Sequence, residues 1–404
     1  MSDLTSTLLI TLTGRDRPGV TSSTLATLAT AGVDVVDLEQ IVLRGRLVLG
    51  LLVTAPEDDS HLRAALEETA RRLEMTIELE EGSNGLPSQR RHRSRVTVIG
   101  TPLTADAMAQ ITTGIADAGA NIDRIIRLAA YPVTAFDLHV SGADKAALRE
   151  ALALIAADAG VDISVQSATL HTRGQRLIVM DVDSTLIQGE VIEMLAAHAG
   201  CEEEVARVTD LAMRGELDFA ESLAARVALL EGLDAGALDR VYDELVLSPG
   251  ARTTVRTLKR LGYRFAIVSG GFSQITDRLA ADLGIDFAAA NELEIVDGKL
   301  TGKVLGEVVD RAGKAKALRR FAAEAGISEA ATIAIGDGAN DLDMLSAAGL
   351  GIAFNAKPLV QAAAHTAVNV PYLDTVMYLL GISREEIEAA DAAAGIVTPA
   401  PPLD

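Results

Sequence analysis

Three apolar runs, each ending abruptly in polar residues, constrain the fold of this 404-residue chain more than any other feature. The runs are RLIVMDVDST from residue 176, YRFAIVSGG from residue 263 and TIAIGDGAND from residue 332, with helical segments between them. Continuous apolar strands that alternate with helices predict a parallel sheet covered on both faces. Ligands bind such sheets at the carboxyl ends of the strands, where these polar clusters stand. We therefore expect an α/β domain with a Rossmann-like parallel sheet.

An insertion interrupts this rhythm between the first two runs. The segment between Leu186 and Ser248 has mostly helical spacing and no strand-like alternation. We expect an α/β domain over residues 175–390 that carries a helical cap at residues 187–248.

The N-terminal part of the chain follows another pattern, in which strands and helices occur twice in the order βαββαβ. LATAGVDVVD in the first copy matches IADAGANIDR in the second, which indicates an internal repeat of about 85–90 residues. This period is too long for a solenoid and predicts two ferredoxin-like domains, over residues 5–84 and 94–170. The arginines from Arg90 to Arg95 lie between the copies, and they fit a solvated linker better than a nucleic-acid patch because the run is short and lacks aromatic residues.

Composition excludes several kinds of partner. Lys plus Arg number 36 and Asp plus Glu 57, so the net charge of −21 repels nucleic acid and anionic lipid. There is no Trp, and no apolar run approaches the ~18 residues of a membrane span. The single cysteine, Cys201, cannot form an internal disulfide, which fits a reducing cytoplasm. We expect a cytoplasmic protein that binds neither nucleic acid nor membranes.

Aspartates follow the first and last apolar runs. Asp181 and Asp183 stand two apart and would share a face if the chain is still a regular strand there. Two carboxylates that close repel each other unless a cation or a proton separates them. Asp337 could offer a further carboxylate to the same oxygen-loving cation, and Asp341 follows it. Taken alone, each motif also fits a plain strand end or turn.

Two further motifs suggest an anion at this edge of the sheet. VSGG supplies the Ser269 hydroxyl, followed by glycines whose backbone N–H groups could face an anion at a helix start. Lys314 stands near the start of another predicted helix, where the helix dipole disfavours a cation, so it calls for an anionic partner. Lys316 fits a solvated surface position.

In the order DxDST, SGG, Lys, GDGxND, these clusters resemble the signature of the haloacid dehalogenase-like phosphatases over residues 176–385. The longer stretches DVDSTLIQGEVIEMLA and MRGELDFAESLAARVALLEGL are similar to those of the phosphoserine phosphatases, cap segments included. This resemblance implies hydrolysis of O-phospho-L-serine to L-serine, the last step of serine biosynthesis, with Mg²⁺ as cofactor. It also implies an aspartyl-phosphate intermediate.

The resemblance assigns a role to each motif residue. Asp181 would be the nucleophile and Asp183 the general acid and base. The metal would be bound by Asp181, Asp183 and Asp337, with Asp341 supporting it through water. Contacts to the substrate would come from Glu190, Phe219, Arg226, Ser269, Gly270, Gly271, Lys314 and Asn340.

Two cap residues would select the amino-acid part of the substrate. The resemblance pairs Glu190 with the ammonium group and Arg226 with the carboxylate, which the fork of a guanidinium binds in a bidentate manner. Phe219 would close over the ligand. Without the resemblance, Glu190 and Arg226 would read as an exposed pair on cap helices.

The first βαββαβ copy, with GRDRPGV before its helix, resembles an ACT domain. In that family the loop binds amino acids at a subunit interface, and the matching positions are Asp16, Gly19 and Val20. The resemblance implies a homodimer built through the ACT domains and serine or another amino acid as effector. The second copy has GTPLTAD instead, so an effector is less expected there. A plain turn before a helix explains the first loop equally well.

Two other functions stay open at this point. One is a phosphotransferase, or a phosphatase for another small phosphomonoester. The other is an amino-acid sensor with an inactive phosphatase domain, against which the complete set of motif residues argues.

Overall fold

The computed structural model describes residues 6–56, 58–81, 93–168, 176–213 and 217–399. Arg90 and Arg91 of the basic linker and the outermost residues of the expected domains lie outside this part. The chain divides into two compact units, Met1–Arg90 and Arg91–Asp404. Among the described residues, no helix has both the length and the apolar character needed to cross a membrane.

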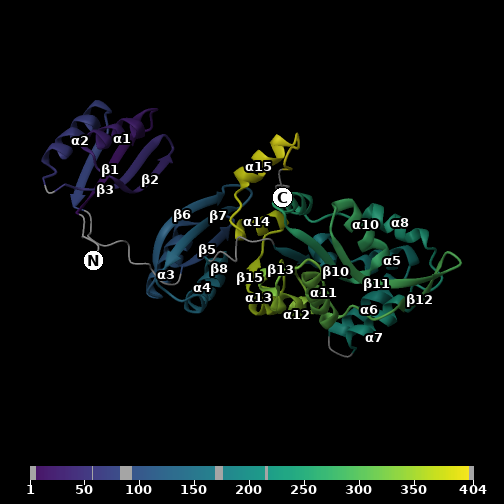
Figure 1. Cartoon of the computed structure of the whole chain (residues 1–404). Coiled ribbons are helices and arrows are strands. Elements are labelled where there is room, and N and C mark those ends of the chain that lie inside the picture. The colour runs from purple at the N-terminus through teal and green to yellow at the C-terminus, as the bar shows by residue number, and fades with distance from the viewer. Residues whose placement is uncertain (1–5, 57, 82–92, 169–175, 214–216, 400–404) are drawn as a thin grey trace. The chain divides into compact units, whose positions relative to one another are not determined.

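The first unit is a βαββαβ sandwich with the antiparallel sheet order β2-β3-β1-β4 (Figure 1). Alternate residues of β1 are buried, so Leu8, Ile10 and Leu12 pack beneath the two helices. Gly19, in the left-handed conformation with φ 97°, caps the first helix. The elements are β1 (Thr7–Arg15), α1 (Val20–Ala31), β2 (Val35–Leu43), β3 (Arg46–Thr54), α2 (Ser60–Arg72) and β4 (Thr76–Glu81).

The second unit begins with another copy of this fold, whose sheet order is β6-β7-β5-β8. The side chains of Thr104 and Asp144 cap its two helices by accepting backbone N–H bonds, as short polar residues do at helix starts. The elements are β5 (Arg93–Gly100), α3 (Ala105–Asp117), β6 (Asn121–Ala129), β7 (Thr134–Ser141), α4 (Lys145–Ala159) and β8 (Asp162–Ser167).

A seven-stranded sheet of order β12-β11-β10-β9-β13-β14-β15 forms the centre of the rest of this unit. Its pairs are parallel except for β11 with β12. All four residues of the central strand β9 are 0% exposed, and burying each such side chain contributes ~1.5–3 kcal/mol. The strands are β9 (Leu177–Met180), β10 (Arg264–Phe272), β11 (Phe287–Val296), β12 (Lys299–Leu305), β13 (Thr332–Gly336), β14 (Leu350–Phe354) and β15 (Thr366–Val368).

Helices cover this sheet and form the inserted cap. The cap contains α5 (Val191–Ala199), α6 (Glu202–Met213), α7 (Phe219–Ala228) and α8 (Gly236–Glu244). The remaining helices are α9 (Ala251–Arg260), α10 (Ser273–Leu283), α11 (Arg311–Glu324), α12 (Leu342–Ala347), α13 (Pro358–Ala363), α14 (Val376–Leu379) and α15 (Arg384–Ala393). The structure confirms the predicted fold class, in which βαββαβ units precede an α/β domain with a parallel sheet.

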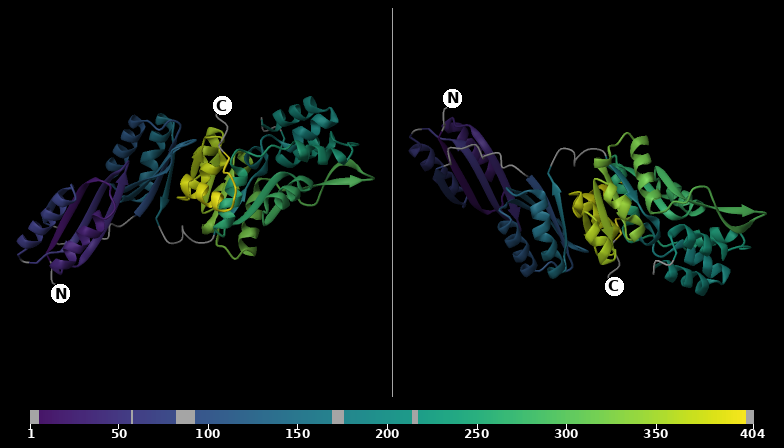
Figure 2. Two further views of the ribbon diagram at one scale, coloured as in Figure 1. Left: turned by 90° about the horizontal axis from the view of Figure 1, so that it is seen from above. Right: turned by 90° about the horizontal axis from the view of Figure 1, so that it is seen from below.

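The second βαββαβ copy shares a hydrophobic core with the α/β domain. Ile99, Leu128 and Ala135 from the copy belong to the same buried cluster as Val368 and Tyr378 from the C-terminal part of the chain. Both views of Figure 2 place the C-terminal segment (yellow) next to this copy (blue). Each copy also has a separate buried cluster of its own, which includes Leu8 in the first copy and Val96 in the second.

Candidate active site

Asp181 lies directly after strand β9. Its backbone N–H donates to the Ile335 carbonyl of β13 at 2.9 Å, which holds the carboxylate at the strand ends. Regular β structure stops at Met180, so Asp181 and Asp183 do not share the face of a strand. Ser184 instead adopts a left-handed φ of 56°, and the turn around it places Asp183 in the same pocket as Asp181. A non-glycine residue in that conformation costs about 1–3 kcal/mol, a cost often found at functional sites.

A buried lysine joins two of the aspartates. The Lys314 ammonium lies 2.8 Å from Asp181 Oδ1 and 2.7 Å from Asp341 Oδ1. Burial alone would lower the pKa of Lys314, but the two carboxylates outweigh it and raise the pKa above its ordinary value. Burial and the charge of Asp341 raise the pKa of Asp181. The lysine therefore stays charged and explains its unusual position near a helix start.

Three carboxylates could hold a divalent cation. One oxygen from each of Asp181, Asp337 and Asp341 lies within 4.8 Å of the others. Thr185 Oγ1 donates to Asp337 Oδ1 at 2.9 Å, while burial and Asp341 raise the pKa of Asp337 to about 6. Three carboxylates around one ammonium leave two negative charges without compensation, and hard cations such as Mg²⁺ bind such oxygen ligands. Among the described residues, this cluster does not include the Asp183 carboxylate.

Asp183 is held by hydrogen bonds on both oxygens. Val191 N–H donates to Oδ1 at 2.8 Å, and the Ser269 hydroxyl donates to Oδ2 at 3.0 Å. Ser269 in turn accepts from Gly271 N–H at 2.7 Å. Burial raises the pKa of Asp183. A carboxyl group that readily holds a proton in this position suits a general acid.

The glycines of VSGG leave room for neighbours on both sides. A Cβ on Gly270 would come within 2.8 Å of the Phe219 ring, so the cap residue lies directly over this glycine. A Cβ on Gly271 would come within 3.0 Å of both Asp183 Oδ2 and the Ser269 hydroxyl. The site needs glycine here for close approach, since neither position has a positive φ.

Glu190 and Arg226 face the pocket from the cap. Burial and the charge of Asp183 raise the pKa of Glu190 to about 7. Burial lowers the pKa of Arg226, although the negative charge of Glu190 acts in the opposite direction. Phe219 and Arg226 stand seven residues apart on α7, two helical turns that return to the same face. A reciprocal cap between Asp218 and Glu221 fixes the start of that helix.

The structure brings the predicted residues around one cavity of about 140 Å³. Ser269 and Asp341 are fully buried behind its wall. The predicted residues that line it are Asp181, Asp183, Glu190, Phe219, Arg226, Gly270, Gly271, Lys314, Asp337 and Asn340.

Asn291 is a site residue that the sequence analysis missed. Its Nδ2 donates to the Gly270 carbonyl at 2.8 Å, and its Oδ1 accepts from Val309 N–H at 2.8 Å. The side chain thereby ties the glycine loop to the segment that leads into α11 and Lys314. The available signal was an asparagine inside an apolar strand, because Asn is depleted in strands and needs partners when buried.

The predicted effector residues lie at the junction of β1 and α1. Asp16 N–H donates to the Gly45 carbonyl at 2.8 Å, Gly19 caps the helix, and Val20 is its first, buried residue. No side chain caps α1, and its first turn contains no acidic residue.

Comparisons with known proteins agree with this geometry. Residues 178–346 match the haloacid dehalogenase-like hydrolase family, and residues 6–80 and 92–166 each match an ACT domain family. A phosphoserine phosphatase of Streptomyces coelicolor is 62% identical over 96% of this chain and 95% of its own length. The chain belongs to the phosphoserine phosphatases.

Other phosphoserine phosphatases and solved structures extend the match. The Mycobacterium tuberculosis protein named phosphoserine phosphatase SerB2 is 52% identical over 95% of both chains. A probable phosphoserine phosphatase from Vibrio cholerae matches with a TM-score of 0.57 and 35% identity, covering 77% of this chain and 91% of that one. A haloacid dehalogenase family hydrolase from Salmonella enterica matches with a TM-score of 0.63 and 31% identity, over 71% and 98%. The predicted family is therefore confirmed.

Proposed function

We propose that this phosphoserine phosphatase hydrolyses O-phospho-L-serine to L-serine and phosphate through a phosphorylated Asp181. The observation that carries the proposal is the 140 Å³ cavity, which has Asp181, Asp183 and Lys314 at one end and Glu190 with Arg226 from the cap. Phosphoserine carries a phosphate, an ammonium and a carboxylate group, and this lining offers a partner of suitable charge to each of them.

Mg²⁺ fits the donor set of Asp181, Asp337 and Asp341. Their oxygens are the hard ligands that this cation prefers, and two uncompensated negative charges match its charge. When bound, the cation would neutralise phosphoryl oxygens that otherwise repel an attacking carboxylate. The Asp183 carboxylate is bonded to Ser269 and Val191, so we assign it to proton transfer.

The chain's own residues then carry out the transfer in two steps. An Asp181 oxygen attacks phosphorus while the bond from phosphorus to the serine oxygen breaks, and Asp183 gives its proton to that oxygen. Water then attacks the phosphorus of the aspartyl-phosphate while Asp183 takes the water proton, and the bond from phosphorus to the Asp181 oxygen breaks, which releases phosphate. Lys314, Ser269 and the N–H groups of the glycine loop hold the phosphoryl oxygens, while Phe219 excludes water above Gly270.

The cap would select the amino acid. A Glu190 carboxylate binds the substrate ammonium, and the Arg226 guanidinium binds the substrate carboxylate. Phosphate esters that lack these groups would leave two charged side chains facing the closed cavity without partners. The preference for phosphoserine over simple phosphate esters follows from that cost.

We also propose an effector site and a homodimer through the first ACT domain. The uncapped N–H groups at the start of α1 could receive an amino-acid carboxylate. Every residue of the edge strand β2 is exposed, including six large apolar ones, which supports pairing with a second copy. Those apolar residues are Val35, Val36, Leu38, Ile41, Val42 and Leu43.

Phosphate release tests the catalytic proposal. The full chain should release phosphate from phosphoserine much faster than from phenyl phosphate or ethyl phosphate, which lack the ammonium and carboxylate groups. EDTA should abolish the activity until Mg²⁺ is restored. Asp181→Asn should abolish the hydrolysis of every ester, with or without Mg²⁺. Equal rates on all esters, or activity that survives in Asp181→Asn, would contradict the assignment.

Sedimentation tests the dimer. Ile41→Asp should shift the chain from dimer to monomer, whereas Leu261→Asp, at a position that is likewise 55% exposed in the α/β domain, should leave the mass unchanged. A monomeric wild-type chain would exclude this interface.

A further inference from the structure

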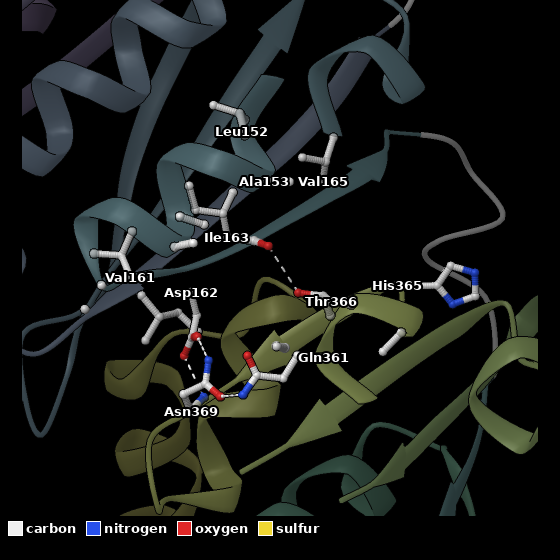
Figure 3. Close-up of a pocket in the computed structure, with 18 of the residues that line it drawn as sticks. Leu152, Ala153, Val161, Asp162, Ile163, Val165, Gln361, His365, Thr366 and Asn369 are labelled. Atoms are coloured by element: carbon white, nitrogen blue, oxygen red, sulfur yellow. Dashed lines mark hydrogen bonds between the residues drawn. The ribbon is translucent and has the colours of Figure 1, made fainter. Parts of the chain in front are cut away.

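A second and larger cavity lies inside the Arg91–Asp404 unit, between α4 and β8 on one side and α13 and β15 on the other (Figure 3). Its volume is about 740 Å³, within the range of ligand pockets. The edge strands β8 and β15 meet here through side chains, because Thr366 Oγ1 donates to the Ile163 carbonyl at 3.3 Å. Asp162 is the only carboxylate among the described residues that line the cavity. Both of its oxygens accept hydrogen bonds from Asn369, one from the backbone N–H at 2.8 Å and one from Nδ2 at 2.6 Å.

An adjoining cavity of about 150 Å³ shares Arg149, Val165 and His365 with the larger one. Lys145 and Arg176 complete a basic lining, and the residues described around this cavity include no carboxylate. This concentration of positive charge stands out in a chain with a net charge of −21. Neither cavity shares a lining residue with the Asp181 pocket.

Lys145 and Arg149 have no counter-charge in the part of the chain that the structure describes. Arg149 donates to the backbone carbonyl of Ala364 at 2.5 Å, which is a neutral partner. The nearby Asp144 carboxylate is exposed and accepts from Ala146 N–H as the cap of α4. Like charges four residues apart destabilise a helix, and cations are also unfavourable in its first turn. Two cations placed in this way call for an anion.

His365 adds a neutral donor to the same wall. Its Nδ1 accepts from Gly351 N–H at 2.8 Å, which leaves the proton on Nε2. Burial lowers the pKa of His365, and the charges of Arg149 and Lys145 lower it further. The imidazole is thus an N–H donor at neutral pH and adds no further charge.

We propose that the smaller cavity binds the carboxylate or phosphate group of a small organic anion, whose uncharged part extends into the larger cavity between α4 and β15. Binding of the anionic group rests on Lys145, Arg149 and the N–H of His365. Binding of the uncharged part rests on the apolar lining of the larger cavity, which includes Leu152, Ile163 and Val165. Because both cavities are lined by the second ACT domain and the catalytic domain, the ligand bridges the two. The proposal is independent of the proposed catalytic function.

Calorimetric titration of the full chain tests the proposal, with phenylphosphonate and phenylacetate as anionic probes and benzylamine as the cationic control. Metal is removed by gel filtration beforehand and EDTA is left out of the titration, because its carboxylates would compete for a basic site. We expect one of the two anions to bind and to raise the melting temperature. In the double variant Lys145→Met/Arg149→Met, the dissociation constant should rise at least tenfold. The control Lys303→Met/Arg319→Met, which loses the same charge from exposed positions, should bind like wild type.

Measurements on the variants without ligand show whether Lys145 and Arg149 serve binding or the stability of the fold. Removing the uncompensated charge of Lys145 alone should leave the melting temperature equal or higher, and in both variants the rate of phosphoserine hydrolysis should stay within twofold of wild type. The single variant Lys145→Met, which keeps the Arg149 bond to Ala364, should show an intermediate loss of affinity. The proposal is overturned if neither anion binds, if benzylamine binds equally well, or if the double variant binds like its control. A large drop in the melting temperature of ligand-free Lys145→Met would also overturn it.

Discussion

Replacing Glu190 by glutamine should stabilise the ligand-free protein while it weakens substrate binding. Burial and the charge of Asp183 raise the pKa of Glu190 to about 7 from an ordinary 4.5. The folded state therefore holds the proton more tightly than the unfolded chain does. The stability that this gives is fully present below about pH 4.5 and is lost as the pH rises through about 7.

The size of the effect follows from this pKa. The change from 4.5 to about 7 corresponds to about 3 kcal/mol of lost stability at pH 8 and less than about 1 kcal/mol at pH 5. Glutamine does not titrate, so its stabilisation relative to wild type should be about 2 kcal/mol larger at pH 8 than at pH 5. At ~2.1 cal/mol/K of unfolding entropy per residue, that is about 3 °C in the melting temperature of the Arg91–Asp404 unit.

Thermal unfolding in EDTA at the two pH values measures the effect. Glu203→Gln, which removes an exposed acid from the cap helix α6, is the matched control. In phosphate-release assays with Mg²⁺, Glu190→Gln should raise KM for phosphoserine by ~10–100-fold, because a charge-assisted hydrogen bond contributes ~1.5–3 kcal/mol. Equal melting shifts at both pH values, or an unchanged KM, would refute the reasoning.

Three further changes test other parts of the structure. Asp183→Asn should slow formation of the aspartyl-phosphate and then trap it, which intact-mass measurement would detect as a phosphate adduct absent from Asp181→Asn. Asn291→Ala should lower kcat/KM by ~5–100-fold, since it leaves the Gly270 carbonyl and Val309 N–H without a partner at ~1–3 kcal/mol; an unchanged rate would show that the loop needs no such tie. Asp391→Ala should destabilise the Arg91–Asp404 unit by ~1.5–3 kcal/mol in urea, because the carboxylate binds Arg256 and Arg260, while kcat of the folded protein stays unchanged.

Local motifs made the fold and much of the site predictable. Asp181 follows an apolar strand directly and Ser269 lies near the carboxyl end of another, so the sheet brings these two side chains together. The turn at Ser184 then places Asp183 beside them. Lys314 was recognisable because its unfavourable position near a helix start called for an anion, and the structure places Asp181 and Asp341 beside it.

Contacts between distant segments were not predictable in this way. Asn291 binds the carbonyl of Gly270 and the N–H of Val309. Every residue has such backbone groups, so the sequence could not show which ones Asn291 binds. The position of Phe219 against Gly270 depends on how the cap packs on the sheet. The ion pairs from Asp391 to Arg256 and Arg260 join segments more than a hundred residues apart, with no local pattern to indicate them.

The shared core of the second ACT domain means that the two repeats are not equivalent parts. A truncation that begins at residue 91 removes a unit with its own core, whereas one that begins at residue 176 uncovers the apolar residues that pack against Ile99, Leu128 and Ala135. Removal of the first repeat should therefore leave the core of the phosphatase domain covered, whereas removal of the second should expose part of that core.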